Sequence, residues 1–91
     1  MKASITDPAR ADFWDLKKYI QQDNPAAAIF VEERIFKVID HLLMFPTMGR
    51  LGRSSNTREL VIRGTPYIVK YQLRQDRIII LRVLHAARKW L

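Results

Sequence analysis

The hydrophobic period of this 91-residue chain changes once, from about 3.6 residues to two, and this change limits the possible folds more than any other feature. Between residues 8 and 45, apolar side chains recur at spacings of three and four, as on one face of a helix. From residue 57 onward they alternate with polar side chains, as in strands that bury one face. Residues 47–56, which separate the two regions, contain two glycines, two serines and an asparagine. The pattern therefore predicts helices packed against a sheet.

Two helices are predicted, at about 8–22 and 25–45, and a proline marks the start of each. Asp7 is the predicted N-cap of the first helix and Asn24 that of the second. The short turn between them predicts an antiparallel hairpin in which each helix contributes one apolar stripe. The stripes consist of Ala9, Phe13, Leu16 and Ile20 in the first helix, and of Ala28, Val31, Ile35, Val38, Leu42 and Phe45 in the second.

Four strands are predicted, and short polar turns join the last three. They span about 2–6, 57–63, 67–73 and 77–84. Strict alternation along the last strand places Val83 and His85 on one face, and Ile80 and Arg82 on the other. Both faces are otherwise apolar, which predicts a central position in the sheet. The order β-α-α-β-β-β is that of an α+β fold, a helical hairpin packed on a small, mainly antiparallel sheet.

Length and composition indicate a single domain over residues 1–91, with a helical hairpin at about 8–45, a sheet at about 57–84 and a basic C-terminal tail at 85–91. Apolar residues make up 48% of the chain, which is enough for one core. The absence of cysteine excludes disulfides and favours a reducing cytoplasm. No apolar run approaches a membrane span of about 20 residues, and no signal peptide is evident. These features predict a cytoplasmic protein that does not enter a membrane.

Positive charge is concentrated in the C-terminal half of the chain. Residues 1–49 contain six Lys and Arg against seven Asp and Glu, a net charge of −1. Residues 50–91 contain ten against two, a net charge of +8. This segregation favours a surface for a polyanion or an acidic protein. A basic surface that only keeps the protein soluble is the alternative.

The C-terminal residues could supply the chemistry of RNA cleavage. Attack by a 2′-hydroxyl requires a base, cations that stabilise the charged phosphorane and an acid for the leaving oxygen. His85, with Lys70, Arg82 and Arg88 nearby in the predicted sheet, offers this set without a metal. The sequence contains no phosphate-binding loop and no second histidine at metal-ligand spacing to His41, so no cofactor is predicted.

The same residues also fit structural roles. His85 could be a strand-end histidine bound to the backbone, and Lys70 a solvated side chain. Arg82 could form an ion pair with Glu59. The last part of the chain, with Arg88, Lys89 and Trp90, could be a solvated tail whose tryptophan covers the core.

Several segments, taken in order, resemble the RelE/ParE family, the toxins of type II toxin–antitoxin modules. They are Asp23-Asn24-Pro25-Ala26-Ala27-Ala28, Phe45-Pro46 with Gly49-Arg50, Thr57-Arg58-Glu59-Leu60, Pro66-Tyr67-Ile68-Val69-Lys70-Tyr71 and Ile80-Leu81-Arg82-Val83-Leu84-His85-Ala86-Ala87-Arg88. These segments cover nearly the whole chain. Their order and spacing carry the resemblance, since none of them is a strict motif.

The resemblance implies a β-α-α-β-β-β toxin domain and a cognate antitoxin that wraps and neutralises it. It also implies one of two targets: RelE-like members cleave mRNA on the ribosome, whereas ParE-like members inhibit DNA gyrase. The ribonucleases typically carry a catalytic arginine where this chain has Ile68. The Asp-Asn-Pro turn and the Arg-Val-Leu-His ending are more similar to ParE. Gyrase inhibition is therefore favoured over mRNA cleavage.

Three sets of site residues are predicted on this basis. Contacts with the target or with nucleic acid are expected from Arg50, Arg53, Arg58, Arg63, Lys89 and Trp90. Contacts with the antitoxin are expected from Phe13, Leu16, Ile20, Val31 and Ile35. If the protein is a ribonuclease, the catalytic residues are expected to be Lys70, Arg82, His85 and Arg88. A non-toxic nucleic-acid-binding module is a further alternative, and it predicts binding that weakens steeply with salt.

Overall fold

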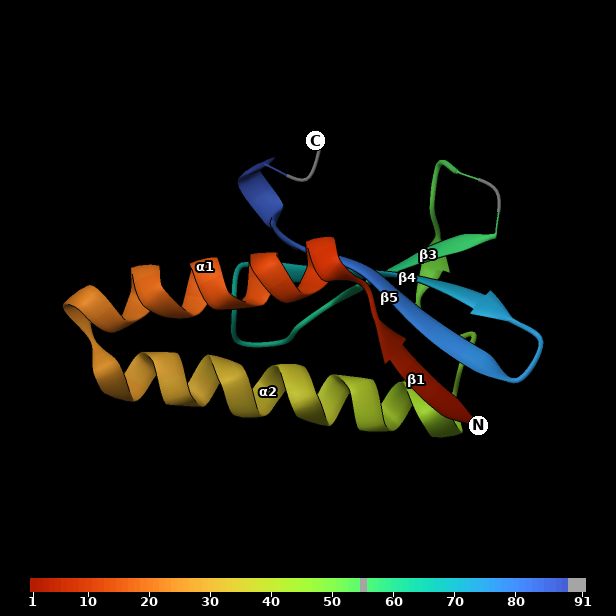
Figure 1. The fold of residues 1–91 in the computed structure, drawn as a ribbon, viewed down its shortest axis with the longest axis horizontal. Helices are drawn as coiled ribbons and strands as arrows, with labels where there is room; N and C mark the ends of the chain where they lie inside the picture. Colours follow the sequence, from red (N-terminus) through yellow and green to blue (C-terminus); the bar gives the residue numbers. More distant parts are fainter. Residues whose placement is uncertain (55, 89–91) are drawn as a thin grey trace.

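The computed structural model describes residues 1–54 and 56–88, and of Arg88 only the backbone. Two helices and five strands follow one another, with a short 3-10 helix at the end (Figure 1). The elements are β1 (Lys2–Ile5), α1 (Asp7–Asp23), α2 (Pro25–Met44), β2 (Arg50–Leu51), β3 (Thr57–Val61), β4 (Tyr67–Arg74), β5 (Arg77–His85) and η1 (Ala86–Arg88). No helix in the described ranges is long and apolar enough to cross a membrane.

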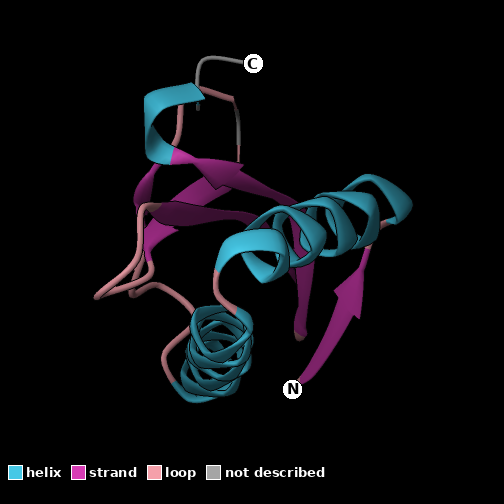
Figure 2. Ribbon diagram, turned by 90° about the vertical axis from the view of Figure 1, so that its left-hand side faces the viewer, coloured by secondary structure: helices cyan, strands magenta, loops and turns pink. Residues whose placement is uncertain are grey.

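One five-stranded sheet runs in the order β1-β5-β4-β3-β2. β1 pairs with β5 in parallel, and the other neighbours are antiparallel. The helices form an antiparallel hairpin on one side of the sheet (Figure 2). The α+β class and the helical hairpin are therefore confirmed. The strand β2 was missed because only two residues of a glycine-containing loop pair there, with Arg58 and Glu59 of β3.

The core lies between the helical hairpin and the inner face of the sheet. Its members come from both predicted helical stripes and from the alternating positions of β4. Fully buried side chains include Ile35, Leu42, Ile62, Val69, Tyr71, Ile78 and Ile80. The helix α2 ends at Met44, one residue before Phe45, because a residue that precedes proline disfavours the helical conformation.

The position and the faces of β5 differ from the prediction. β5 is an interior strand between β1 and β4, but the middle of the sheet is β4. A bulge interrupts its pairing: Lys70 faces Arg82 and the next residue, Tyr71, faces Ile80, so Leu81 has no opposite residue. The extra residue reverses the alternation. Val83 therefore shares the core face with Ile80, and Arg82 lies on the outer face, contrary to the prediction from strict alternation.

The helix α1 begins one residue earlier than predicted. Its N-cap is Thr6, whose hydroxyl accepts a hydrogen bond from the Ala9 amide (3.2 Å), and not Asp7. Thr6 is held in an extended conformation because its own amide donates to the Ile80 carbonyl of β5 (3.1 Å). The second cap is as predicted, since the Asn24 side chain accepts a hydrogen bond from the Ala27 amide (3.0 Å).

Candidate functional site

The free edge of β5 is where the predicted catalytic residues meet helix α1. The strand β1 pairs with β5 only as far as Ile80, so within the described residues no strand pairs with the rest of β5 on that side. The start of α1 replaces the missing strand. The Thr6 hydroxyl lies 3.0 Å from the carbonyl oxygens of both Ile80 and Leu81, and the Val83 amide donates to Oδ2 of Asp12 (3.0 Å). Polar side chains thus complete the hydrogen bonding of an open strand edge.

Arg82 is bound to the same carboxylate. Its Nε lies 2.7 Å from Oδ2 of Asp12, and a terminal nitrogen lies 2.9 Å from Oδ1, which is the bidentate arrangement of a strong ion pair. The hydrogen bonds to Asp12 raise the pKa of Arg82, so its charge is fixed. An ion pair was considered for Arg82 from the sequence, but with Glu59, whereas its partner in the structure is Asp12. Glu59 instead pairs with Arg50, 3.2 Å away.

His85 ends β5 on the inner face, opposite Tyr67. Its ring meets the Tyr67 ring edge-on, with centroids 5.5 Å apart. Its Nδ1 accepts a hydrogen bond from the Ala87 amide (3.1 Å), so this geometry assigns the proton of the neutral ring to Nε2. The structural role considered for His85, a strand-end histidine bound to the backbone, is therefore present in the fold.

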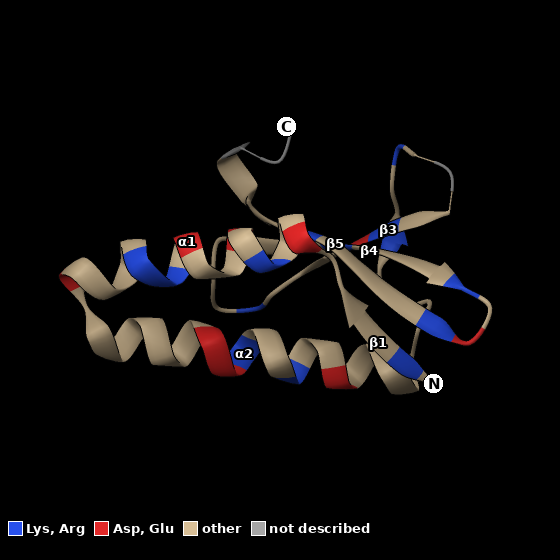
Figure 3. Cartoon of the chain, viewed as in Figure 1, with Lys and Arg blue, Asp and Glu red and all other residues tan. Residues whose placement is uncertain are grey.

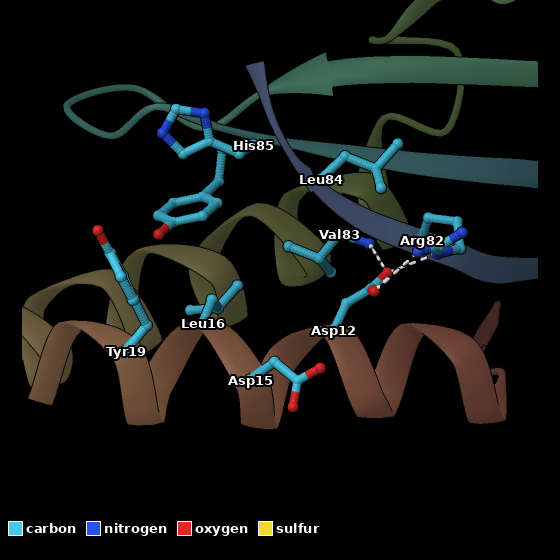
Figure 4. A pocket seen from close by; sticks show the side chains of 9 residues that line it. Asp12, Asp15, Leu16, Tyr19, Arg82, Val83, Leu84 and His85 are labelled. Carbon is cyan, nitrogen blue, oxygen red and sulfur yellow. Dashed lines mark hydrogen bonds and ion pairs between the residues drawn. The ribbon is translucent and has the colours of Figure 1, made fainter. Parts of the chain in front are cut away.

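His85 and Arg82 line opposite ends of one open cleft of about 390 Å³ (Figure 4). The cleft is lined by Asp12, Asp15, Leu16, Tyr19, Tyr67, Arg82, Val83, Leu84 and His85. Arg82, the one permanent cation among the described residues of this lining, is already paired with Asp12, and Asp15 adds a second carboxylate. The described lining therefore presents net negative charge to a phosphate. No cluster of potential metal ligands occurs among the described residues.

Of the predicted catalytic residues whose side chains the structure describes, Arg82 shares the cleft with His85 but Lys70 does not. Lys70 lies beside Glu59 and Arg82 in the ladder, on the outer face of the sheet. His85 is on the inner face, two residues beyond the core residue Val83. Arg88 is described only by its backbone, in η1, and Lys89 and Trp90 lie outside the described residues. The described part of the set is thus divided between two faces.

The predicted target-binding arginines fall into two groups. Arg58 is structural, because it donates to the carbonyl oxygens of Thr47 (3.2 Å) and Gly49 (2.8 Å) and so holds the loop before β2. Arg50 is tied to Glu59. Arg53 and Arg63 are exposed, and neither takes part in an ion pair of the described residues. Figure 3 shows Lys and Arg on the strands and loops as well as on both helices, where most of the Asp and Glu residues also lie.

Tyr71 fixes the same loop from within the core. Its hydroxyl accepts a hydrogen bond from the Gly49 amide (2.9 Å) and donates to the Pro46 carbonyl (2.8 Å). Burial raises the pKa of Tyr71, although the hydrogen bond from Gly49 and the charge of Arg58 act in the opposite direction. The loop that carries Arg50 and Arg53 is therefore anchored at its start.

The apolar residues predicted to bind an antitoxin belong mainly to the core. Leu16, Val31 and Ile35 are buried inside the chain, and Phe13 and Ile20 pack against them. Most of this set is therefore engaged in the core, although Phe13 and Ile35 also line an apolar groove, and the antitoxin contacts stay a prediction. The exposed aromatic residues of the helices are Trp14 and Phe36, which lie just off the predicted stripes, as well as Tyr19 and Phe30. In the sequence, large aromatic residues outside the predicted apolar stripes could have indicated this exposed surface.

Trp14 and Phe36 line an apolar groove of about 220 Å³ between the helices and β1. Phe13 joins them, with its ring centroid 6.0 Å from that of Trp14 and 5.7 Å from that of Phe36. Trp14 is 53% exposed and Phe36 48% exposed. A contiguous, solvent-facing aromatic surface of this kind is typical of a protein-binding site.

Comparisons with known proteins agree with this fold. The family model described as "ParE toxin of type II toxin-antitoxin system, parDE" matches residues 3–90. A protein designated toxin Y4kP, from Sinorhizobium fredii, is 42% identical over 76 residues, which cover 84% of this chain and 78% of that protein. Toxin RelE2 of Caulobacter vibrioides is 36% identical over 80 residues, which cover 88% of this chain and 89% of that protein.

A solved structure of a chromosomal ParDE toxin–antitoxin system from P. aeruginosa has the same fold. Its TM-score is 0.82, and the match covers 93% of this chain and 95% of that chain at 20% identity. The resemblance inferred from the ordered segments of the sequence is thus confirmed by the family model and by both relatives. The chain belongs to the ParE toxin family of type II toxin–antitoxin systems.

Proposed function

We propose that this toxin arrests growth by binding DNA gyrase and that it catalyses no reaction of its own. The observation that supports this proposal is that neither of the two predicted catalytic cations with a described side chain, Lys70 and Arg82, is available to a phosphate beside His85. Arg82 is neutralised by Asp12, and Lys70 lies on the other face of the sheet. A ribonuclease that acts without a metal needs positive charge beside its acid and base to stabilise the phosphorane. In this fold the acid–base candidate lies in a cleft with two carboxylates.

The target surface of the proposed gyrase inhibitor is the basic C-terminal half. Arg53 and Arg63 are its exposed members from the predicted set that form no ion pair among the described residues, and they are free to pair with an acidic partner or with DNA held by gyrase. Exposed cations of this type accelerate association and set specificity. The family match to ParE supports the same target. Because one relative is named toxin RelE2, mRNA cleavage is the alternative function to be tested.

Two assays on purified toxin distinguish these functions. We expect the protein to inhibit gyrase supercoiling and to leave mRNA intact on programmed ribosomes. Arg53→Ala with Arg63→Ala is expected to weaken gyrase inhibition by about tenfold, because two steering charges are lost. His85→Ala with Arg88→Ala provides the comparison. If the wild-type toxin cleaves mRNA on the ribosome and the variant with His85→Ala and Arg88→Ala does not, the gyrase proposal is overturned and a RelE-like ribonuclease is supported.

We also propose that a cognate antitoxin binds this chain through a disordered, acidic segment that folds on binding. The aromatic groove around Trp14 and Phe36 offers the apolar contact. The net charge of +7 on the whole chain favours an acidic partner. The groove includes Phe13 and Ile35 of the set that the sequence suggested, and it lies mainly on the same two helices.

The antitoxin interaction predicts a large gain in thermal stability. At a concentration of about 100 times its Kd, the product of the neighbouring antitoxin gene should add about 2.7 kcal/mol and raise the Tm by about 10 °C. Trp14→Ala with Phe36→Ala should weaken binding by about 100-fold, since both are exposed anchors. Tyr19→Ala, in α1 but outside the groove, is the matched control. The absence of any Tm change with wild-type toxin would reject this partner.

A further inference from the structure

One end of the sheet carries a row of three cations on three neighbouring strands. Lys2 of β1 lies opposite Arg77 of β5, and Arg77 lies opposite Arg74 of β4. Residues directly opposite one another point to the same side of a sheet. Since the next residue of β5, Ile78, belongs to the core, the three cations lie on the outer face. Figure 3 shows basic segments at the start of β1 and at the turn between β4 and β5.

The charge of this row is not neutralised within the described chain. Lys2, Arg74 and Arg77 are exposed, and none of the ion pairs formed by the described residues includes them. Arg77 donates instead to the hydroxyl of Ser4 (2.7 Å). Three positive charges against the one carboxylate of the turn, Asp76, leave a net charge of +2. Like charges directly opposite one another destabilise a sheet, so the row costs stability that a bound anion would restore.

The turn between Arg74 and Arg77 is strained at Gln75. Its φ is +52°, in the left-handed region that glycine and asparagine adopt more readily in hairpin turns. Gln75 is exposed and lines an open cleft of about 630 Å³ together with Arg74 and Arg77. Backbone strain of this kind occurs often at binding sites. A glutamine amide can also donate to a phosphate oxygen, which gives this side chain a use beside the cations.

The surface around the row suits phosphate better than protein. Neither α1 nor α2 lies over it, because both helices pack on the inner face of the sheet (Figure 2). Among the described residues, no exposed large apolar side chain belongs to β4 or β5. Protein interfaces depend on apolar and aromatic anchors in a desolvated centre. Phosphate contacts instead use exposed arginine, lysine and amide donors, which are the groups present at this end of the sheet.

We propose that this end of the sheet binds the phosphate backbone of duplex DNA. The row spans about 10 Å, because neighbouring strands lie about 4.8 Å apart. Each strand of B-DNA carries one phosphate per about 3.4 Å of helix axis, so the row matches about three successive phosphates. Contacts of this kind position a protein on DNA without reading its sequence. The inference rests on the gyrase function proposed above, since gyrase holds DNA, and adds a direct contact between toxin and DNA.

The charge contacts are tested by titrating the whole toxin with a short DNA duplex at about 50 to 200 mM salt. Lys2→Ala with Arg74→Ala should weaken binding by about 50-fold at about 0.1 M salt. It should also reduce the slope of log Kd against log salt by about 1.8, since each phosphate contact accounts for about 0.9. Lys18→Ala with Lys37→Ala removes the same net charge from exposed positions of the helices. This matched control should change the Kd by less than about threefold, because salt screens distant exposed charges.

Gln75→Gly separates binding from stability. Glycine adopts the left-handed conformation without steric cost, so the Tm should change by less than about 2 °C. The loss of the amide donor should nevertheless weaken DNA binding by about fivefold. A purely structural role for this residue predicts the reverse, a change in Tm with no change in DNA affinity. That result would overturn the phosphate contact assigned to Gln75.

The outcomes separate this proposal from the one on which it rests. If both pairs of variants lose DNA affinity equally, DNA responds only to net charge and the proposed site is overturned. If the variant with Lys2→Ala and Arg74→Ala keeps its DNA affinity and instead binds DNA-free gyrase more weakly, the row contacts an acidic protein surface and DNA is the wrong ligand. Tighter binding to an RNA duplex of the same length would also overturn DNA as the ligand. If DNA binding follows the prediction but the wild-type toxin does not inhibit gyrase, the DNA site stands and the gyrase function is wrong.

Discussion

Asp12→Ala is expected to destabilise the toxin by about 3 kcal/mol, because one carboxylate accepts three hydrogen bonds that hold α1 against β5. The replacement leaves the Arg82 guanidinium and the Val83 amide without their partner. The Asp12 side chain is only 16% exposed and that of Arg82 38%, so solvent replaces the lost contacts in part. We place the loss at the lower end of the range for breaking a buried pair, about 3–5 kcal/mol. Chemical denaturation measures it directly.

Two variants make this measurement specific. Asp15→Ala removes an exposed carboxylate one turn later in α1 and should change the free energy of unfolding by less than about 0.5 kcal/mol. Asp12→Asn keeps one oxygen acceptor but loses the charge, so it should cost about 2 kcal/mol. A loss below 1 kcal/mol for Asp12→Ala would show that the contact is solvated and contributes little, as in many surface ion pairs.

Gly49→Ala is expected to cost about 3 kcal/mol as well, for a steric reason. A methyl group at this position would lie 2.8 Å from both Cε1 and the hydroxyl oxygen of Tyr71, and 2.9 Å from the Glu59 carbonyl oxygen. Tyr71 is fully buried and cannot move away, since its hydroxyl is bound to Gly49 and Pro46. The loop must therefore move, which breaks these hydrogen bonds. Thermal and chemical denaturation should both report the loss.

A double-mutant cycle with Tyr71→Phe tests this explanation. Removing the hydroxyl leaves the Gly49 amide and the Pro46 carbonyl without partners, and should cost about 2 kcal/mol alone. In the Gly49→Ala background the same change should cost less, because the clash with the hydroxyl disappears with it. Thr47→Ala, an exposed position in the same loop, is the control. If the stability losses of Gly49→Ala and Tyr71→Phe simply add in the double variant, the clash with the Tyr71 hydroxyl is not the cause of the Gly49→Ala loss.

The secondary structure was largely predictable because its signals are local. The proline-marked helix starts and the spacings of three and four identified both helices to within about two residues. The short polar turns identified β3, β4 and β5. What failed was the face of the residues after Ile80, since a bulge depends on the pairing of two strands and leaves no mark in the sequence of either one.

The candidate site was less predictable than the fold. The sequence placed Lys70, Arg82 and His85 near one another on neighbouring strands, and the ladder does bring Lys70 opposite Arg82. Strict alternation also placed His85 on the face opposite Arg82, as the ladder does, but it could not show which of these two faces is the inner one. Nor could it show that Arg82 pairs with Asp12, a residue 70 positions away that reaches β5 only because β1 ends at Ile5. Glu59 was the partner suggested from the sequence, and it pairs with Arg50 instead.

By itself, the sequence determined the helical hairpin, the three long strands, the basic C-terminal half and the membership of a toxin family. Each of these rests on local periodicity, on composition or on ordered segments, all of which can be read along one chain. The tertiary structure alone decided which cations are free and on which face each one lies. That outcome depends on the Arg82–Asp12 pair, the bulge at Leu81 and the short β2, which arise only when distant segments pack together. Burial and pairing, not residue type, thus separate the residues that hold the fold from those left for a partner.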